Sequence, residues 1–424
     1  MSNRIGVLQV IGVIMLYLLL RMMLLFLQEF TIDVDAFAKS ISITNASLIS
    51  QAGTTLTIEN AAYYGFRTND SNCNITIGGT MIINTSARNG IFNQASSSFV
   101  NNGTIYIDGT GANYAGIDSR SNFTNNGNIY IDDCNNASGI LNYNSGQTFT
   151  NSASGNIYIA TLGAMGYHGV DNQSIFLNQG NISIGLNGIT LGRNGINNSV
   201  NGNFTNSGTL SVNNTGSSGN FSAIENVGSF QNSNSLTILS DNYRGVGNTG
   251  TFTNSSGGTL NVATTESSNI YNYSSGNFTN SGTLILNGTT TVNSPNIDNR
   301  TVLPNSATGI CNIDNSAGQG IYNYSAGTFT NNGAINIGQS GNISTHGIQN
   351  DGVFENTDQI SIGSASYSIG GRGIILSNTF NNNGGTINID NTTSAALQNN
   401  GGTTSNTNGG TINIGLQKLC SHRN

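Results

Sequence analysis

The stretch Phe-Thr-Asn-Ser-Gly-Thr-Leu-Ser-Val at residues 204–212 decides the fold of this chain, because close variants of it return along most of the sequence. It reads Phe-Thr-Asn-Asn-Gly-Asn-Ile-Tyr-Ile at residues 123–131 and Phe-Thr-Asn-Asn-Gly-Ala-Ile-Asn-Ile at residues 329–337. Between copies lies a further phrase, Gly-Ile-x-Asn, as at residues 139–142 and 320–323. A fixed long period made of short strand-like pieces is the signature of a solenoid.

The phenylalanines set the period. Neighbouring copies are separated by 22 to 28 residues, apart from one step of 51 residues that hides a degenerate copy. In that copy Ile297 stands for the Gly-Ile phrase, Leu303 takes the Phe position and Ile310 is assigned to the Ile-x-Ile position. Pro295 and Pro304 both fall there, and since proline cannot donate a ladder hydrogen bond, we expect the least regular coil at this place. The phenylalanines of the series are Phe99, Phe123, Phe149, Phe176, Phe204, Phe230, Phe252, Phe278, Phe329, Phe354 and Phe380.

Side-chain alternation within the phrase indicates which residues face the core. Ile105 and Ile107 are two residues apart and point the same way in a strand, whereas Tyr106 points the other way, to solvent. Three strands joined by short polar turns make one coil, and each coil adds about 4.8 Å along the axis. We predict an all-β chain: a single right-handed parallel β-helix over residues 39–415, with three strands per coil and about fifteen coils, hence a rod roughly 70 Å long.

Asparagine recurs two residues after the phenylalanine. Identical amides stacked coil upon coil can donate to one another and form a ladder. Asparagine also tolerates the left-handed backbone of a corner. We therefore expect this row to be structural rather than to bind a ligand. The row consists of Asn101, Asn125, Asn151, Asn178, Asn206, Asn232, Asn254, Asn280, Asn331, Asn356 and Asn382.

Charge is scarce in this chain. Charged residues make up 7% of it and the formal net charge is −7, so a basic track for nucleic acid is absent. The regular apolar positions argue against the disorder that such a polar composition otherwise suggests. Four cysteines, Cys73, Cys134, Cys311 and Cys420, are too scattered for a disulfide framework or a zinc site, so we expect isolated thiols.

Residues 1–38 differ from the repeats. The run 5–27 is almost entirely apolar, and Ala-Phe-Ala at 36–38 resembles a signal-peptidase site. We expect residues 1–38 to be a signal peptide cleaved before Lys39, and the protein to be secreted or held at a bacterial cell surface. A retained membrane anchor is the alternative, because the apolar run is nearly long enough to span a bilayer. The third possibility is that the start of the protein is assigned wrongly, so that part of this segment is not translated.

Parallel β-helices include polysaccharide-cleaving enzymes, which use carboxylates held across one glycosidic bond. Asp132 and Asp133 form a carboxylate pair, and His168 and His346, each followed by glycine, resemble the His-Gly of polygalacturonases. Both histidines, however, occupy a repeat position where other copies carry Asn or Ser. The Arg-x-Lys with which that family holds an acidic substrate is missing. We therefore expect no catalysis.

Calcium and ice binding are disfavoured as well. The Gly-Gly-x-Gly-x-Asp nonapeptide of calcium-binding β-rolls does not occur, and isolated aspartates do not supply six oxygen ligands. A regular Thr-x-Thr row, which ice-binding faces usually carry, is also missing. We expect neither a metal nor another cofactor.

Tyr106, Tyr130 and Tyr158 occupy the middle of Ile-x-Ile in three successive copies. We expect them to stack as an exposed aromatic ladder on one face of the rod. Such a ladder stabilises a sheet, and it is also a surface on which a carbohydrate or a protein docks. These three tyrosines are the candidate binding residues. A second cluster falls in the Gly-Ile-x-Asn strands and their turns: Tyr271, Tyr273, Tyr322 and Tyr324.

The turn between Ile-x-Ile and the next Gly-Ile phrase varies most in length. Variable loops on a rigid scaffold are where recognition residues usually lie. We expect these turns to line up along one edge of the rod beside the tyrosines, and any partner to dock there. Examples are residues 109–115, 133–138, 161–168, 186–194 and 214–222.

The repeated phrase Phe-Thr-Asn-x-Gly-Thr-Ile-x-Ile resembles the repeats of bacterial autotransporter passengers and related haemagglutinin-like exported adhesins, over roughly residues 85–415. The resemblance implies a β-helix, export, and a surface glycan or protein receptor as partner. Passengers of this class usually precede a C-terminal membrane β-barrel, which is missing here. Membrane contact is therefore expected only through the N-terminal segment or the missing barrel. The irregular tail at 416–424 is what a frameshift or a truncated gene produces.

The expected function is that of an exported cell-surface protein, an adhesin or a passive surface scaffold. Two alternatives stay open. One is a polysaccharide-active enzyme with the same fold, and the other is an inert remnant of a larger autotransporter. The fold does not decide among them.

Overall fold

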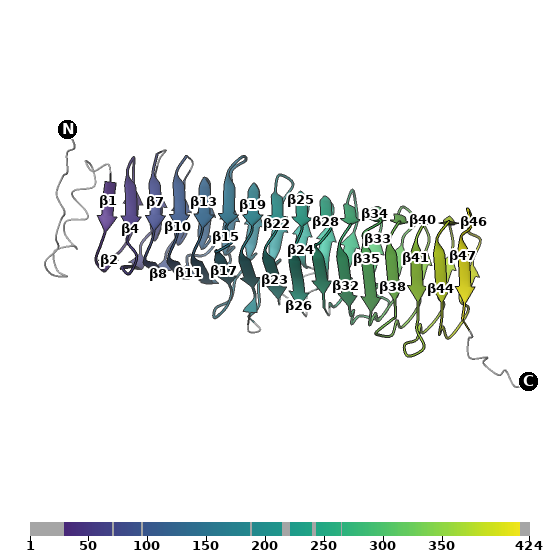
Figure 1. Cartoon of the computed structure of the whole chain (residues 1–424). Helices are drawn as coiled ribbons and strands as arrows, with labels where there is room; N and C mark the ends of the chain where they lie inside the picture. Colours follow the sequence, from purple (N-terminus) through teal and green to yellow (C-terminus); the bar gives the residue numbers. More distant parts are fainter. Residues whose placement is uncertain are drawn as a thin grey trace, which may run out of the picture.

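The computed structural model describes residues 29–69, 72–94, 96–186, 189–213, 221–239, 243–263 and 265–415. The predictions for the apolar run at 5–27 and for the tail at 416–424 lie outside the described residues. The described chain winds through three parallel sheets and forms a rod, with its first and last coils at opposite ends (Figure 1). The described residues contain no helix with the length and apolar character needed to cross a membrane.

Each successive strand joins the next of the three sheets, here called sheets A, B and C. Sheet A consists of β1 (Glu29–Ile32), β4 (Ser47–Ser50), β7 (Asn74–Ile77), β10 (Ser98–Asn101), β13 (Asn122–Asn125), β16 (Thr148–Asn151), β19 (Ile175–Asn178), β22 (Asn203–Asn206), β25 (Ser229–Asn232), β28 (Thr251–Asn254), β31 (Asn277–Asn280), β34 (Val302–Asn305), β37 (Thr328–Asn331), β40 (Val353–Asn356), β43 (Phe380–Asn383) and β46 (Thr404–Thr407).

Sheet B consists of β2 (Ala36–Ala38), β5 (Thr55–Ala61), β8 (Thr80–Ser86), β11 (Thr104–Thr110), β14 (Asn128–Cys134), β17 (Asn156–Ile159), β20 (Asn181–Ile184), β23 (Thr209–Asn213), β26 (Ser235–Leu239), β29 (Thr259–Val262), β32 (Thr283–Asn287), β35 (Ile310–Asp314), β38 (Ala334–Ile337), β41 (Gln359–Ile362), β44 (Thr386–Ile389) and β47 (Thr411–Ile414).

Sheet C consists of β3 (Ile41–Ile43), β6 (Phe66–Thr68), β9 (Ile91–Asn93), β12 (Ile117–Ser119), β15 (Ile140–Asn142), β18 (Val170–Asn172), β21 (Ile196–Asn198), β24 (Ser222–Asn226), β27 (Arg244–Asn248), β30 (Ile270–Asn272), β33 (Ile297–Asn299), β36 (Ile321–Asn323), β39 (Ile348–Asn350), β42 (Ile374–Leu376) and β45 (Leu397–Asn399).

The predicted architecture is confirmed. Strands β1 to β45 make fifteen complete coils of three strands, and β46 and β47 add two strands of another. All the strand pairs are parallel, so the sheets are built by one chain winding around one axis. The right-handed sense of the winding stays a prediction.

The phenylalanine row lies inside the coil, as predicted. Phe204 pairs with Phe230 in the register of sheet A, and both side chains are fully buried. From Phe99 to Phe278 successive rings stack with centroids 4.7–4.9 Å apart and planes within 10° of each other. The inward pairs of sheet B, such as Ile105 and Ile107, complete this apolar core.

The asparagine row forms the predicted ladder, and it is buried. From Asn101 to Asn406 each side-chain Nδ2 donates to Oδ1 of the asparagine in the next coil, at 2.7–2.9 Å. The suggestion that these residues adopt the left-handed conformation of a corner is wrong. They close the strands of sheet A, and positive φ falls on other asparagines, such as Asn315 and Asn391 in the turns after sheet B.

A second buried ladder follows the Gly-Ile-x-Asn phrase and was not predicted. It runs through sheet C from Asn142 to Asn350, with Nδ2 to Oδ1 distances of 2.7–3.0 Å. Both ladders also donate to backbone carbonyls at the bends. Asn206, for example, donates to the Ser235 carbonyl at 3.0 Å. Two corners of the coil are thus closed by hydrogen-bonded amides that water does not reach.

The degenerate copy differs from its prediction at one position. Leu303 pairs with Phe329 in sheet A, as expected. On the other side of β34, Leu303 and Pro304 have no paired residue in β31, so this coil is irregular, as predicted. Ile310, however, points outward and is 39% exposed, whereas Cys311 and Ile313 are buried. The assignment of Ile310 to the core is therefore wrong. A shift of one residue sends every side chain of a strand to the other face.

The start of the solenoid also differs. Strands β1 and β2 pair with β4 and β5 ahead of the predicted boundary at Lys39, and Ile32 and Ala36 are buried in the core. The solenoid therefore includes residues ahead of residue 39, from Glu29 at least. Cleavage before Lys39 would remove both strands.

Candidate binding surfaces

The tyrosine stack has the predicted geometry. Tyr106, Tyr130 and Tyr158 are in register on β11, β14 and β17 of sheet B. Their ring centroids are 4.8 and 4.9 Å apart and the planes lie within 13° of each other. Tyr106 is 42% exposed and the other two are half-buried. Partial burial against the neighbouring rings raises the pKa of Tyr130. In the preceding coil Ile82 occupies the same column, so the strip is apolar at that end.

The turns 109–115, 133–138 and 161–168 all lead from sheet B to sheet C, so they lie along one edge of the rod beside the tyrosine stack, as predicted. Only parts of the turns 186–194 and 214–222 lie among the described residues. Near the end of β11, just before the first of these turns, burial and nearby carboxylates raise the pKa of Asp108, which is in register with Asp132. The edge is thus acidic in these coils.

The structure does not bring the residues that resembled those of polygalacturonases into one site. The Asp132 carboxylate accepts hydrogen bonds from Thr161 N at 2.6 Å, Leu162 N at 3.0 Å and Gly163 N at 3.3 Å, so it fastens the turn of the next coil. His168 is buried, and burial lowers its pKa to about 3. His346 precedes β39, seven strands along sheet C from β18, which follows His168. These residues are separate variants of repeat positions.

Potential metal ligands and thiols are likewise dispersed. In the described ranges no group of three or more His, Cys, Asp or Glu side chains is arranged to hold a metal ion. Cys73, Cys134 and Cys311 are buried free thiols, and burial raises the pKa of Cys134 and of Cys311 to about 12. Cys420 lies outside the described residues.

The outer face of sheet C carries a second surface, most of which sequence reasoning missed. Arginine side chains alternate there with aromatic rings from neighbouring coils. Arg244 lies between Tyr243 and Tyr271, with its guanidinium carbon 4.7 and 4.0 Å from the ring centroids. Arg300 lies between Tyr271 and Tyr324, at 4.9 and 4.2 Å. We call this surface the arginine–aromatic column. Its members are Tyr64, Arg67, Phe92, Arg120, Tyr143, Tyr167, Arg193, Phe221, Tyr243, Arg244, Tyr271, Arg300 and Tyr324.

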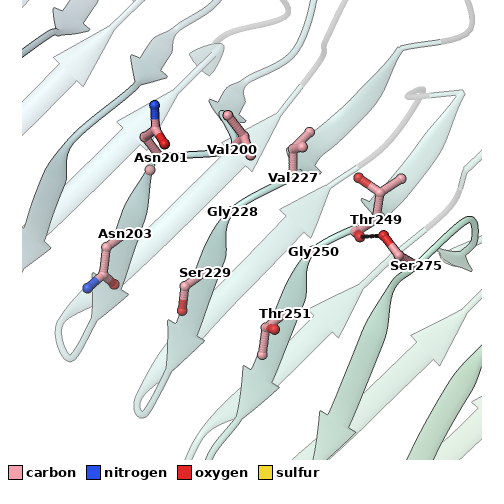
Figure 2. Close-up of a pocket in the computed structure, with 11 residues that line it drawn as sticks. Val200, Asn201, Asn203, Val227, Gly228, Ser229, Thr249, Gly250, Thr251 and Ser275 are labelled. Carbon is pink, nitrogen blue, oxygen red and sulfur yellow. Dashed lines mark hydrogen bonds between the residues drawn. The ribbon is translucent and has the colours of Figure 1, made fainter. Parts of the chain in front are cut away.

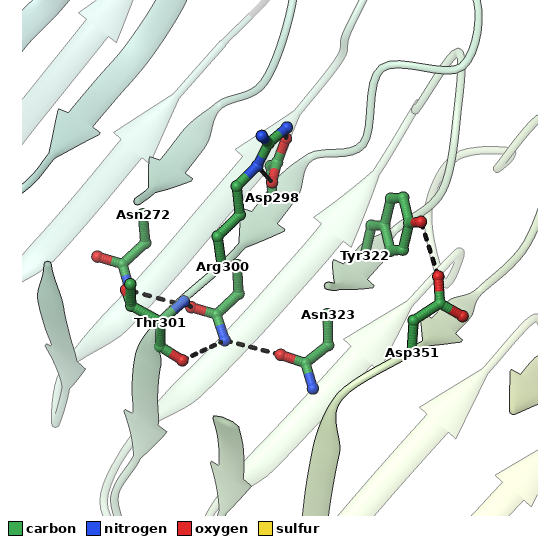
Figure 3. Close-up of polar contacts among 8 residues, drawn as sticks. Asn272, Asp298, Arg300, Thr301, Tyr322, Asn323 and Asp351 are labelled. Carbon is green, nitrogen blue, oxygen red and sulfur yellow. Dashed lines mark hydrogen bonds and ion pairs between the residues drawn. The ribbon is translucent and has the colours of Figure 1, made fainter. Parts of the chain in front are cut away.

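Carboxylates in the middle of the sheet C strands accompany this column. Arg300 pairs with Asp298 of β33 through Nε and Nη2 at 2.9 and 3.1 Å, and Figure 3 shows the two side chains meeting. Burial nevertheless raises the pKa of the Asp298 carboxyl, although the Arg300 guanidinium opposes the rise. Nearby, the Tyr322 hydroxyl donates to Asp351 at 2.7 Å, and its pKa is raised by burial and by that carboxylate (Figure 3).

A shallow groove of about 510 Å³ lies on the turns that lead from sheet C to sheet A. Val200, Val227 and Thr249 stand along it in neighbouring coils, with glycines between them (Figure 2). A Cβ atom on Gly228 would lie 2.2 Å from the Gly202 carbonyl oxygen, so the stacking of the turns requires glycine there. The lining has no ionisable side chain, and the groove is a consequence of the small residues.

A second hollow of about 270 Å³ opens at the last coils, where the apolar core approaches the surface. Phe380, Leu397 and Ile412 line it, and Leu397 and Ile412 are only half-buried. The following residues, 416–424, are not among those described. The hollow thus lies where the described part of the lumen ends, and Thr404, Ser405 and Asn406 are its polar lining residues.

Comparison of the sequence with protein-family models found no match, and comparison with curated proteins found no significant match. The two aromatic surfaces must therefore be interpreted from their geometry. Sheet B presents a short stack of tyrosines beside an acidic edge, and sheet C presents a longer column of rings and guanidinium groups.

Proposed function

We propose that this protein is an exported cell-surface rod that binds a glycan or a protein along its outer faces, in the manner of an adhesin. The tyrosine stack on sheet B carries the proposal. Three aligned, partly exposed rings form a flat aromatic strip on a rigid scaffold, and such strips are docking surfaces for sugars and for protein side chains. The resemblance of the repeats to exported adhesins supports export and a role at the surface.

The stack is not needed to hold the coils in register. In the next coils the same column contains Ser183, Ser211 and Thr237, and β20, β23 and β26 pair there with the same register. The buried phenylalanine row and the two asparagine ladders run through these coils with or without tyrosine. The exposed rings are therefore free to serve binding.

The test compares the full chain with a variant carrying Tyr106→Ser, Tyr130→Ser and Tyr158→Ser. Binding to a panel of immobilised glycans and surface proteins is measured together with the far-ultraviolet circular dichroism and the melting temperature. Matched control substitutions are Thr124→Ser and Thr150→Ser, which lie on the outer face of sheet A in two of the same coils. We expect the tyrosine variant to lose binding while its spectrum and melting temperature hardly change.

Two outcomes would contradict the proposal. A parallel loss of folding and binding would mean that the stack is structural only. Unchanged binding in a folded variant would exclude the tyrosine stack as the docking surface.

A further inference from the structure

Within the part of the chain that the structure describes, the lysine and arginine side chains gather in and next to the strands of sheet C. Every lysine and arginine of the described residues lies in a strand of sheet C or within three residues of one. No described strand of sheet A or sheet B contains a lysine or an arginine, although four of the cationic residues lie in turns within two residues of such a strand. Packing does not demand this arrangement, because an outward-facing arginine fits a strand of any sheet. The cationic residues are Lys39, Arg67, Arg88, Arg120, Arg193, Arg244, Arg300 and Arg372.

The rings hold the guanidinium groups in fixed orientations. Arg193 lies over Tyr167 at 4.0 Å and over Phe221 at 5.4 Å. Stacking occupies the faces of a guanidinium group and leaves the N–H donors at its edge for other partners. An arginine held in this way loses less conformational freedom when it binds an anion.

Most of these guanidinium groups have no carboxylate partner. Among the residues that the structure describes, Arg120 and Arg300 are the two that form ion pairs, with Asp118 and Asp298. Arg88 instead donates to the Tyr64 hydroxyl at 3.1 Å. Several guanidinium groups are thus repeated along the rod, although the full chain has a formal net charge of −7. The paired N–H donors of each guanidinium group match the geometry of a carboxylate or a sulfate group.

Hydrogen-bond acceptors lie between the cations. Asp171 on β18 and Glu225 on β24 are both in register with Asn197 of β21, so they lie on the same outer face, and both are half-buried. Asp171 accepts from Asn197 at 2.9 Å, and the Tyr273 hydroxyl donates to Glu225 at 2.9 Å. Carboxylates among the arginines suit a polymer that offers hydroxyl donors as well as acid groups.

We propose that the outer face of sheet C is a binding site for an acidic polysaccharide that lies along the rod. Its acid groups bind the guanidinium edges of Arg193 and Arg244, and its hydroxyl groups donate to the neighbouring carboxylates. This inference shares with the proposed function only the premise that the rod is a binding protein. It uses a different face from the tyrosine stack, so the two fail separately.

The experiment measures binding of the full chain to polygalacturonate and to the same polymer with its carboxyl groups methyl-esterified. Dextran sulfate and dextran form a second matched pair, which distinguishes sulfate from carboxylate recognition. We expect binding of an acidic polymer that weakens as salt is raised, and no comparable binding of its neutral form. The double substitution Arg193→Gln with Arg244→Gln removes two guanidinium groups that have no carboxylate partner in the protein. Each lost contact with an acid group of the polymer should weaken binding by roughly tenfold or more.

Two further variants test whether binding depends on the guanidinium groups of sheet C. Arg193→Lys with Arg244→Lys retains the charge but loses the planar fork, so we expect intermediate binding. The chain with all three tyrosines of sheet B replaced by serine should bind the acidic polymer normally. The melting temperature of each chain is measured in parallel, so that loss of binding in a folded chain is recognised.

Equal binding of the acidic and the neutral polymers would overturn the proposal while leaving glycan binding by the rod intact. Failure to bind any of the acidic polymers would overturn it as well. Tighter binding of a single-stranded oligonucleotide than of either acidic polysaccharide would show that the column selects nucleic acid instead. Binding that is lost only in the tyrosine variant would assign the acidic polymer to sheet B.

Discussion

The side-chain amide of Asn206 donates a hydrogen bond of 2.7 Å to Oδ1 of Asn232, and both side chains are fully buried. Asn206 in turn accepts from Asn178 at 2.7 Å, so one amide satisfies its neighbours on both sides. A buried polar group costs free energy unless its hydrogen bonds are made. The ladder therefore couples each coil to the next at a corner that the apolar core does not fill.

We expect Asn206→Leu to destabilise the rod more than the loss of one hydrogen bond would suggest. The substitution leaves Oδ1 of Asn232 buried without its donor, and an unsatisfied buried group costs about 1–3 kcal/mol. Urea unfolding measures the change. The matched control is Asn126→Leu, which removes an exposed side-chain hydrogen bond of 2.8 Å to Asn102. This substitution should change the free energy of unfolding far less. Equal effects of the two substitutions would show that burial of the ladder is unimportant.

Substitutions of Phe230 test how much the buried phenylalanine row contributes to stability. Its ring lies 4.8 Å from that of Phe204 and 4.9 Å from that of Phe252. Phe230→Ala should cost about 3–5 kcal/mol, because it opens a cavity in the stack. Phe230→Leu should cost much less, since Leu303 already occupies this position in another coil. Thermal and urea unfolding measure both variants. Equal stability of the leucine and alanine variants would contradict the claim that a large apolar side chain must fill this position.

The buried side chain of His168 should make the stability of the fold depend on pH. Burial lowers its folded pKa to about 3, so the folded protein keeps it neutral while an unfolded chain binds a proton below about pH 6.5. Stability is therefore lost as the pH falls from about 6.5 towards 3. His168→Asn should reduce this loss, and asparagine suits the position because Asn194 occupies it in the next coil. Urea midpoints of both chains across this pH range provide the measurement, and parallel curves would refute the assignment.

The first coil provides a prediction about the N-terminal boundary. A chain that begins at Glu29 keeps β1 and β2, whereas a chain that begins at Lys39 removes Ile32 and Ala36 from the core and exposes the edges of β4 and β5. We expect the shorter chain to melt at a lower temperature and to self-associate through its bare edges. Calorimetry and size-exclusion chromatography compare the two. Identical behaviour would mean that the first coil adds nothing to the rod.

Much of the fold could be predicted from the sequence because one phrase repeats with a strand period. Alternation within Ile-x-Ile distinguishes Tyr106 from Ile105, and the spacing of phenylalanines counts the coils. The error at Ile310 has a definite cause. Leu303 and Cys311 are eight residues apart, as are Phe149 and Ile157, so both coils contain the longer turn after the asparagine. Applying that longer spacing to the degenerate copy would have assigned Cys311 to the core.

The candidate surfaces were predicted less completely. The tyrosine stack could be found because its members share one position in the repeat. The arginine–aromatic column could not, because its arginines stand at different distances from the inward isoleucine of sheet C. Arg193 precedes Ile196 by three residues, whereas Arg120 follows Ile117 by three. Only the stacking of coils brings such positions onto one face, and long side chains then reach rings in neighbouring coils.

The most direct test of the central claim, that the rod binds through the tyrosine stack of sheet B, is hydroxyl-radical footprinting of the full chain alone and bound to the surface or glycan that it recognises. Oxidation of Tyr106, Tyr130 and Tyr158 is quantified by mass spectrometry, with Tyr367 as an exposed tyrosine away from the stack. The account predicts that the three stacked tyrosines become protected together on binding while Tyr367 does not change. Binding that leaves all three as reactive as in the free chain would contradict it.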